Sequence, residues 1–149
     1  MEEKKYNYLI IEAQRNNIHR YVVGAIVERE NSVLLLKRHQ EDFMGGIYEL
    51  PSGKVESGES LDKALSREVE EETGLTIGSI VRYLGHFDYK SKSGEKTRQF
   101  NFLVSVNYGI GVVLQEHETY AWAKKEEVNN FSVTESVKKI LSYYWDNNI

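Results

Sequence analysis

The segment GESLDKALSREVEEETG, which covers residues 58–74, constrains the fold more than any other part of the chain. Its polar and apolar residues recur at helical spacing. Ser60 fits an N-cap, Asp62 suits a first helical turn, and Gly74 stands where a left-handed C-cap glycine belongs. We therefore predict a helix over residues 60–73.

Three glutamates of this helix continue the apolar stripe of the turns before them. At about 100° per residue, one face of the helix carries both sets of side chains. The apolar set is Leu61, Ala64 and Leu65, and the acidic set is Glu68, Glu71 and Glu72. Glu70 points to the opposite side. A solvated helix can be rich in glutamate, but its charges would not extend the face that enters the core.

Like charges at the edge of a core repel one another strongly. At about 6 Å and an effective dielectric constant near 20, each pair costs roughly 2–3 kcal/mol. Arg67 can orient one of these carboxylates, so the cluster needs raised pKa values or a bound cation. The donors are hard oxygens and the chain has no cysteine, which favours Mg²⁺ or Mn²⁺ over zinc.

Other segments predict a sheet and a second helix. Strands are expected at residues 19–30, 32–39, 77–89, 98–106 and 120–123, with a short extended segment around Pro51. FSVTESVKKILSYYW, residues 131–145, predicts a helix with a capping box of Ser132 and Glu135. Its apolar stripe consists of Val137, Ile140, Leu141 and Tyr144. These elements predict an α/β (α+β) fold with a mixed sheet, in one domain of residues 1–149.

The charge balance restricts the partners. A net charge of −4 and a pI near 5.6 argue against a protein that coats nucleic acid or a membrane surface. No apolar run reaches the length that spans a bilayer, and the N-terminal segment does not resemble a signal peptide. We expect a cytoplasmic monomer or homodimer that acts on a small molecule.

The spacing of the glutamates resembles the signature of the Nudix hydrolase family. Gly53 is followed by five residues and Glu59, then by seven residues and REVEEETGL, residues 67–75. This resembles the Nudix box in every specified position. Such a match would arise by chance in fewer than about one in a million chains of this length. A weaker likeness extends over about residues 20–145.

The resemblance implies a Nudix-type α/β/α sandwich and MutT-like, metal-dependent hydrolysis of a nucleoside diphosphate derivative. Mg²⁺ or Mn²⁺ would offset the charge of the pyrophosphate and activate the attacking water. The implied metal ligands are Glu68, Glu71, Glu72 and the carbonyl of Gly53. Arg67 would hold a glutamate in place, and Glu59 would be structural.

A carboxylate must also take the proton of the attacking water. In the family this base comes from the box or from a later acidic loop, where this chain offers Glu116 and Glu118. We predict a direct role for Glu116. His117, which stands between them, is expected to be a solvated loop histidine.

The substrate is chosen by elimination. Arg38 is expected to contact phosphate, and Tyr48 and Phe43 to stack on a base. The chain lacks the downstream proline of many ADP-ribose members and the characteristically spaced tyrosine of dinucleoside-polyphosphate members. This favours a (deoxy)nucleoside triphosphate, oxidised or not, that is cleaved to a monophosphate and pyrophosphate.

Several alternatives stay open. One is an ADP-ribose or other nucleoside-diphosphate-sugar pyrophosphatase, and another is a dinucleoside polyphosphate hydrolase. A third is a Nudix-fold ligand-binding or regulatory module without activity, since a fold alone does not fix a function. The acidic net charge counts against an RNA 5′-end pyrophosphohydrolase.

Overall fold

The computed structural model describes residues 5–42, 44–107 and 111–147. Its elements follow the chain as α1 (Asn7–Arg15), β1 (Arg20–Arg29), β2 (Ser32–Lys37), β3 (Tyr48–Glu49), β4 (Ser52–Lys54), α2 (Leu61–Thr73), β5 (Ile77–Lys90), β6 (Lys96–Val106), β7 (Thr119–Ala123), the 3-10 helix η2 (Lys125–Asn130) and α3 (Glu135–Asn147). None of the described helices has the length and apolar character needed to cross a membrane.

The strands form one mixed sheet. Its order is β3-β2-β1-β6-β5, with β4 paired to β1 and β7 paired to β2. β1 and β6 run parallel, whereas the other pairs are antiparallel. The first two predicted strands form an antiparallel hairpin of β1 and β2, and its turn residues Glu30 and Asn31 both have positive φ. This backbone geometry suits the right-handed twist of a two-residue hairpin.

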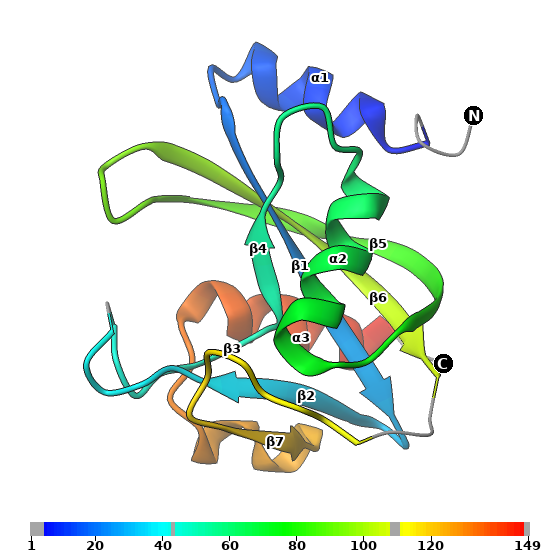
Figure 1. Ribbon diagram of the computed structural model, residues 1–149, viewed down its shortest axis with the longest axis vertical. Coiled ribbons are helices and arrows are strands. Elements are labelled where there is room, and N and C mark those ends of the chain that lie inside the picture. Colours follow the sequence, from blue (N-terminus) through cyan, green and yellow to red (C-terminus); the bar gives the residue numbers. More distant parts are fainter. Residues whose placement is uncertain (1–4, 43, 108–110, 148–149) are drawn as a thin grey trace.

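Helices cover both faces of the sheet (Figure 1), which confirms the predicted α/β/α sandwich. Alternate residues of β1 enter two different cores. Val23, Ala25 and Val27 pack with residues of α1 and α2, whereas Ile26 packs with residues of α3. Successive side chains of a strand point to opposite faces, so the near-continuous apolar run of β1 serves both cores.

The helix that carries the glutamates forms as the sequence predicts. Ser60 occupies the N-cap with extended backbone, and Gly74 ends the helix with a φ of 74°. The amide of Gly74 donates to the carbonyl of Glu70 at 2.9 Å. The Ser60 hydroxyl makes no capping hydrogen bond, however, and finds no partner among the described residues.

The predicted capping box of Ser132 and Glu135 is wrong. α3 begins at Glu135, and the Oγ1 of Thr134 accepts a hydrogen bond from the amide of Val137 at 3.2 Å. Ser132 lies before the helix, where its carbonyl accepts the amide of Tyr48 at 2.7 Å. That contact with β3 holds Ser132 outside the helix, so the next hydroxyl residue caps it. The predicted stripe of α3 is buried, as expected.

The sequence analysis missed two elements, α1 and η2. α1 is short, and only Leu9 and Ala13 of its residues are buried. η2 has no buried residue. Neither segment therefore shows the apolar periodicity by which the other helices were predicted.

Thr134→Ala removes the side-chain cap of α3 and is expected to lower the free energy of unfolding by about 1 kcal/mol. Ser132→Ala keeps the backbone contact with Tyr48, so it serves as the matched control and should cost less than half as much. Urea denaturation followed by far-UV circular dichroism measures both changes. Equal losses in the two variants would contradict the assignment of the cap.

Candidate active site

Arg67 is the centre of the charged cluster on α2. Its Nε and Nη2 donate to Glu59 at 2.7 and 2.9 Å, and its Nη1 donates to Glu68 at 2.7 Å and to Glu71 at 3.2 Å. Nη2 also donates to the carbonyl of Lys54 at 3.0 Å. Arg67 thus orients more than the one glutamate expected of it, because the planar fork of five N–H groups binds three. Its hydrogen bonds lower the pKa of Glu59.

Glu68 lies directly against the backbone of β4 at Gly53. A Cβ atom on Gly53 would lie 1.9 Å from the carboxyl carbon of Glu68, a distance that no side chain tolerates. Glycine at this position therefore gives the carboxylate its place. The side chain of Glu68 is 14% exposed, and burial raises its pKa even though Arg67 binds it.

Glu72 lies one turn further along the same face. Its Oε1 accepts a hydrogen bond from the amide of Ser52 at 2.8 Å. Burial raises the pKa of Glu72 to about 8, and the charge of Glu68 contributes to this rise. All N–H groups of Arg67 are engaged elsewhere, so Glu72 is the carboxylate whose charge this arginine leaves uncompensated.

Glu71 is more exposed than the other two carboxylates. Its side chain is 58% exposed and turns to Arg67, while Glu70 is also exposed. The charge of Glu71 still helps to raise the pKa of Glu68, as that of Glu68 does for Glu72, so the predicted crowding holds although Glu71 is exposed. The difference arises because Glu71 lies at the border of the buried face, where water and Arg67 can reach it.

The donor set fits a divalent cation. As the side chains of the described residues lie, no three acidic or histidine groups are close enough together to hold a metal ion. Glu68 and Glu72 nevertheless reach adjacent residues of β4, and both carboxyl groups have raised pKa values. Glu71 is exposed beside them, where it accepts a hydrogen bond from Arg67. Hard oxygen donors with excess negative charge suit Mg²⁺ or Mn²⁺.

His117 is buried beside this cluster, so the expectation of a solvated loop histidine is wrong. Its side chain is 7% exposed, and its Nε2 lies 2.7 Å from the Oε2 of Glu49. Burial opposes the charge of the imidazole, but the hydrogen bond to Glu49 and the charge of Glu72 outweigh it and raise the pKa of His117. Glu49 also pairs with Arg38 at 3.3 Å.

The other acidic residues of the loop lie at the surface. Glu116 is exposed. The carboxylate of Glu118 pairs with the ammonium of Lys37 at 3.4 Å. The backbone amide of Glu118 also donates to the backbone carbonyl of Lys37. The loop is therefore anchored directly after Glu116. A direct catalytic role for Glu116 stays a prediction.

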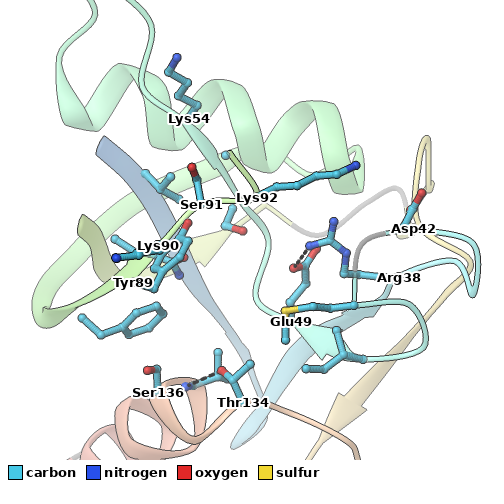
Figure 2. A pocket seen from close by; sticks show the side chains of 18 of the residues that line it. Arg38, Asp42, Glu49, Lys54, Tyr89, Lys90, Ser91, Lys92, Thr134 and Ser136 are labelled. Carbon is cyan, nitrogen blue, oxygen red and sulfur yellow. Dashed lines mark hydrogen bonds and ion pairs between the residues drawn. The ribbon is translucent and has the colours of Figure 1, made fainter. Parts of the chain in front are cut away.

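A cavity of about 620 Å³ opens beside the carboxylates (Figure 2). Glu72 and Gly53 line it together with the predicted substrate contacts Arg38 and Tyr48. The ring of Tyr48 also packs edge-to-face on Phe131, with centroids 4.9 Å apart. Phe43, the other predicted stacking residue, lies outside the described residues.

The sequence analysis missed much of the lining of this cavity. Figure 2 shows Arg38 and Glu49 on one side, Tyr89 and Lys90 on another, and Thr134 at the start of α3. Lys92 extends over the same space from the turn between β5 and β6. These residues come from segments far apart in the chain, and no local pattern marks them.

A comparison with family models decides what kind of protein this is. The model described as the NUDIX domain matches residues 18–144. The chain belongs to this family. It is a Nudix hydrolase that acts on nucleoside diphosphate derivatives, and the hydrolases of this family generally use divalent metal ions.

Individual relatives agree on the family but differ in substrate. The chain is 34% identical to a CTP pyrophosphohydrolase of Escherichia coli over 71% of this chain and 76% of the relative. It is 44% identical to an ADP-ribose pyrophosphatase of Methanocaldococcus jannaschii, over 42% of this chain and only 36% of that relative. Among solved structures, a MutT protein from Methanosarcina mazei is similar with a TM-score of 0.73 and 25% identity. That match covers 89% of this chain and 97% of the other.

The raised pKa of Glu72 predicts how the stability of the metal-free protein depends on pH. Its protonated carboxyl stabilises the fold fully below the unfolded value of 4.5, and this contribution is lost as the pH rises through about 8. Glu72→Gln keeps an acceptor for Ser52 without a charge. Its free energy of unfolding, relative to that of the unmodified protein, should therefore rise by on the order of 2 kcal/mol between pH 5 and pH 9.

Urea denaturation at pH 5, 7 and 9 in the presence of EDTA measures this difference. Glu70→Gln removes an exposed charge from the same helix and serves as the control. The difference in the free energy of unfolding between Glu72→Gln and the unmodified protein could instead stay constant with pH. That result would show that burial does not raise the pKa of Glu72.

Proposed function

We propose that the protein hydrolyses (deoxy)nucleoside triphosphates, oxidised or not, to a monophosphate and pyrophosphate. The observation that carries this proposal is the shared cavity. The acidic residue Glu72 lines the same space as the cations Arg38 and Lys90 and the aromatic residue Tyr89. A nucleotide needs such a combination, because its phosphates bind cations and its base packs against apolar and aromatic side chains.

The extent of the similarities supports a triphosphate over ADP-ribose. The likeness to the CTP pyrophosphohydrolase extends over 71% of this chain, whereas the likeness to the ADP-ribose pyrophosphatase covers 42%. The shorter match leaves out more than half of the chain. The CTP pyrophosphohydrolase is therefore similar to this chain over the larger share of its length.

Glu68, Glu71, Glu72 and the carbonyl of Gly53 would hold Mg²⁺ or Mn²⁺, which supplies charge neutralisation at the pyrophosphate and activation of the attacking water. The chain prepares this site in three ways. Arg67 holds Glu68 and Glu71, the amide of Ser52 fixes Glu72, and the missing side chain of Gly53 makes room for Glu68.

The remaining polar residues of the cavity have separate roles. Arg38 is oriented by Glu49, which His117 holds from the other side, so Arg38 can bind phosphate in a fixed position. Lys90 and Lys92 add positive charge at the rim. Glu116 would accept the proton of the attacking water, because it adjoins His117, whose charge interacts with Glu72.

The proposal is tested by measuring the products from nucleoside triphosphates, ADP-ribose and a dinucleoside tetraphosphate, each with Mg²⁺ and with EDTA. Mg²⁺-dependent release of pyrophosphate from the triphosphates is the expected result. Faster cleavage of ADP-ribose or of the dinucleotide would assign the alternative substrate class. Binding of these compounds without any cleavage would indicate a binding module instead.

Glu71→Gln and Glu72→Gln are each expected to lower turnover of the triphosphate at least about a hundredfold, because each removes a carboxylate that the catalytic metal requires. Glu70→Gln is the matched control, since it makes the same chemical change on the opposite side of α2 and should alter turnover little. Steady-state rates at saturating Mg²⁺, with circular dichroism to check folding, give the answer. Near-normal rates in both Glu71→Gln and Glu72→Gln would show that catalysis requires neither carboxylate.

Glu116→Gln is expected to lower the rate at saturating substrate and Mg²⁺ while the Mg²⁺ concentration at half-maximal rate stays unchanged. A general base contributes to the proton transfer and not to metal binding, so the two quantities separate. Glu71→Gln should change both. An unchanged rate in Glu116→Gln would place the base among the glutamates of α2.

A further inference from the structure

Two side-chain amides are buried at the base of the cavity. Asn101 of β6 is fully buried, and Gln99, two residues earlier on the same side of the strand, is 7% exposed and lines the cavity. These two residues are called the amide pair below. Polar groups with this degree of burial are nearly always hydrogen-bonded, so the direction in which each amide faces is fixed by its partners.

The partners of Asn101 determine its orientation. Its Nδ2 donates to the carbonyl of Gly85 at 3.2 Å and to the carbonyl of Gln99 at 3.3 Å. Both partners are carbonyl oxygens, which cannot donate, so the amide nitrogen of Asn101 must face them. Its Oδ1 therefore faces the other way.

The orientation of Asn101 in turn determines that of Gln99. The Oδ1 of Asn101 accepts a hydrogen bond from the Nε2 of Gln99 at 2.9 Å. An inverted Gln99 would bring two amide oxygens together, which costs the hydrogen bond and adds repulsion. The Oε1 of Gln99 is thus the atom left over, and it has no hydrogen-bond partner among the described residues.

Gly24 of β1 makes space for the amide pair. A Cβ atom there would lie 2.4 Å from the Nε2 of Gln99 and 2.6 Å from the Oδ1 of Asn101. The hydrogen bond between the two amides therefore lies directly over the backbone of the neighbouring strand. This packing leaves the side chain of Gln99 little room to rotate.

Aromatic residues lie beside Gln99 in the sheet. Phe87 of β5 is the register partner of Gln99, and it lines the cavity together with Tyr89. The two rings have centroids 6.1 Å apart. A planar ring that packs against these side chains would present its edge to the floor of the cavity, where Gln99 offers a hydrogen-bond acceptor.

We propose that Gln99 is a specificity-determining residue whose Oε1 accepts a hydrogen bond from an exocyclic amino group of the nucleobase. This inference rests on the proposed function. It predicts a preference for cytosine over uracil and for adenine over hypoxanthine, which differ in an amino group or an oxygen at the same ring position. An oxygen on the base would face Oε1 as a second acceptor, and the amide pair prevents Gln99 from inverting to offer its nitrogen.

Titration calorimetry with nucleoside monophosphates tests the preference without metal or catalysis. The pairs are CMP with UMP and AMP with IMP. In the pair that binds more tightly, the amino-bearing member is expected to have an affinity about 10–100-fold higher, since the other leaves a buried acceptor unpaired. Equal affinities within that pair, or no detectable binding of any of the four, would overturn the inference.

Two variants separate recognition from folding. Gln99→Leu removes the acceptor at similar size and should bring the ratio of affinities close to one. Asn101→Leu leaves Gln99 in place but frees it to invert, so the ratio should also fall, which a purely structural role would not cause. Ser105→Ala, an exposed change on the same strand, is the control and should keep the original ratio. A preference that persists in Gln99→Leu would overturn the assignment.

Hydrolysis of CTP and UTP by the Mg²⁺-loaded protein distinguishes this inference from the proposed function. Discrimination between the monophosphates without cleavage of either triphosphate would overturn the proposed function and leave the role of Gln99 standing. Cleavage of both triphosphates at equal kcat/KM, together with equal affinities for the monophosphates, would overturn the role of Gln99 alone.

Discussion

The contact between α2 and β4 places carboxylates where water cannot fully solvate them, and much of the surrounding structure compensates for this. Glu68 lies against Gly53 and Glu72 binds the amide of Ser52. A buried carboxylate without a partner is costly, so its pKa rises or a cation is recruited. Arg67 compensates part of the negative charge through its hydrogen bonds to Glu68 and Glu71. Glu72 is the carboxylate that Arg67 does not reach, and burial raises its pKa to about 8. A bound divalent ion, as proposed above, would compensate its charge.

The path of the chain between β3 and β4 explains how this acidic site adjoins the cationic side of the cavity. β3 pairs with β2, whereas β4 pairs with β1, so the chain changes its partner strand between them. Pro51 lies at this change and cannot donate to a strand ladder, although its carbonyl accepts the amide of Ala25 at 2.9 Å. Glu49, which binds Arg38, and Ser52, which binds Glu72, are thereby brought to neighbouring positions in one cavity.

The sequence predicted those features that depend on periodicity. The helical angle of each residue was enough to place Glu68 and Glu72 on the buried face of α2 and Glu70 outside it. Features that depend on contacts across the chain were not predictable in this way. His117 reaches Glu49 across 68 positions, so nothing near His117 indicates its burial.

The amide pair illustrates the same limit. Alternation along β6 marks one face as apolar, but it does not reveal that the polar face is covered as well. Asn101 is buried because Gly24 brings the backbone of β1 close on one side and the backbone at Gly85 offers an acceptor on the other. The first contact depends on the parallel register of β1 and β6, and the second on the irregular register near Gly85. Neither register is encoded by a short-range pattern.

The two sides of the cavity, the carboxylates of α2 beside β4 and Gln99 on β6, differ in how rigidly their polar groups must be held. In the proposed function, α2 and β4 would bind what all nucleoside diphosphate derivatives share, and an ionic site tolerates small displacements because Coulomb attraction varies slowly with distance. Discrimination between bases requires an acceptor that cannot turn into a donor when the wrong base arrives. A glutamine on a loop could invert its amide and satisfy either base. On β6, Asn101 and the close backbone of Gly24 remove that freedom, so a polar group held inside the sheet is suited to selection as well as to binding.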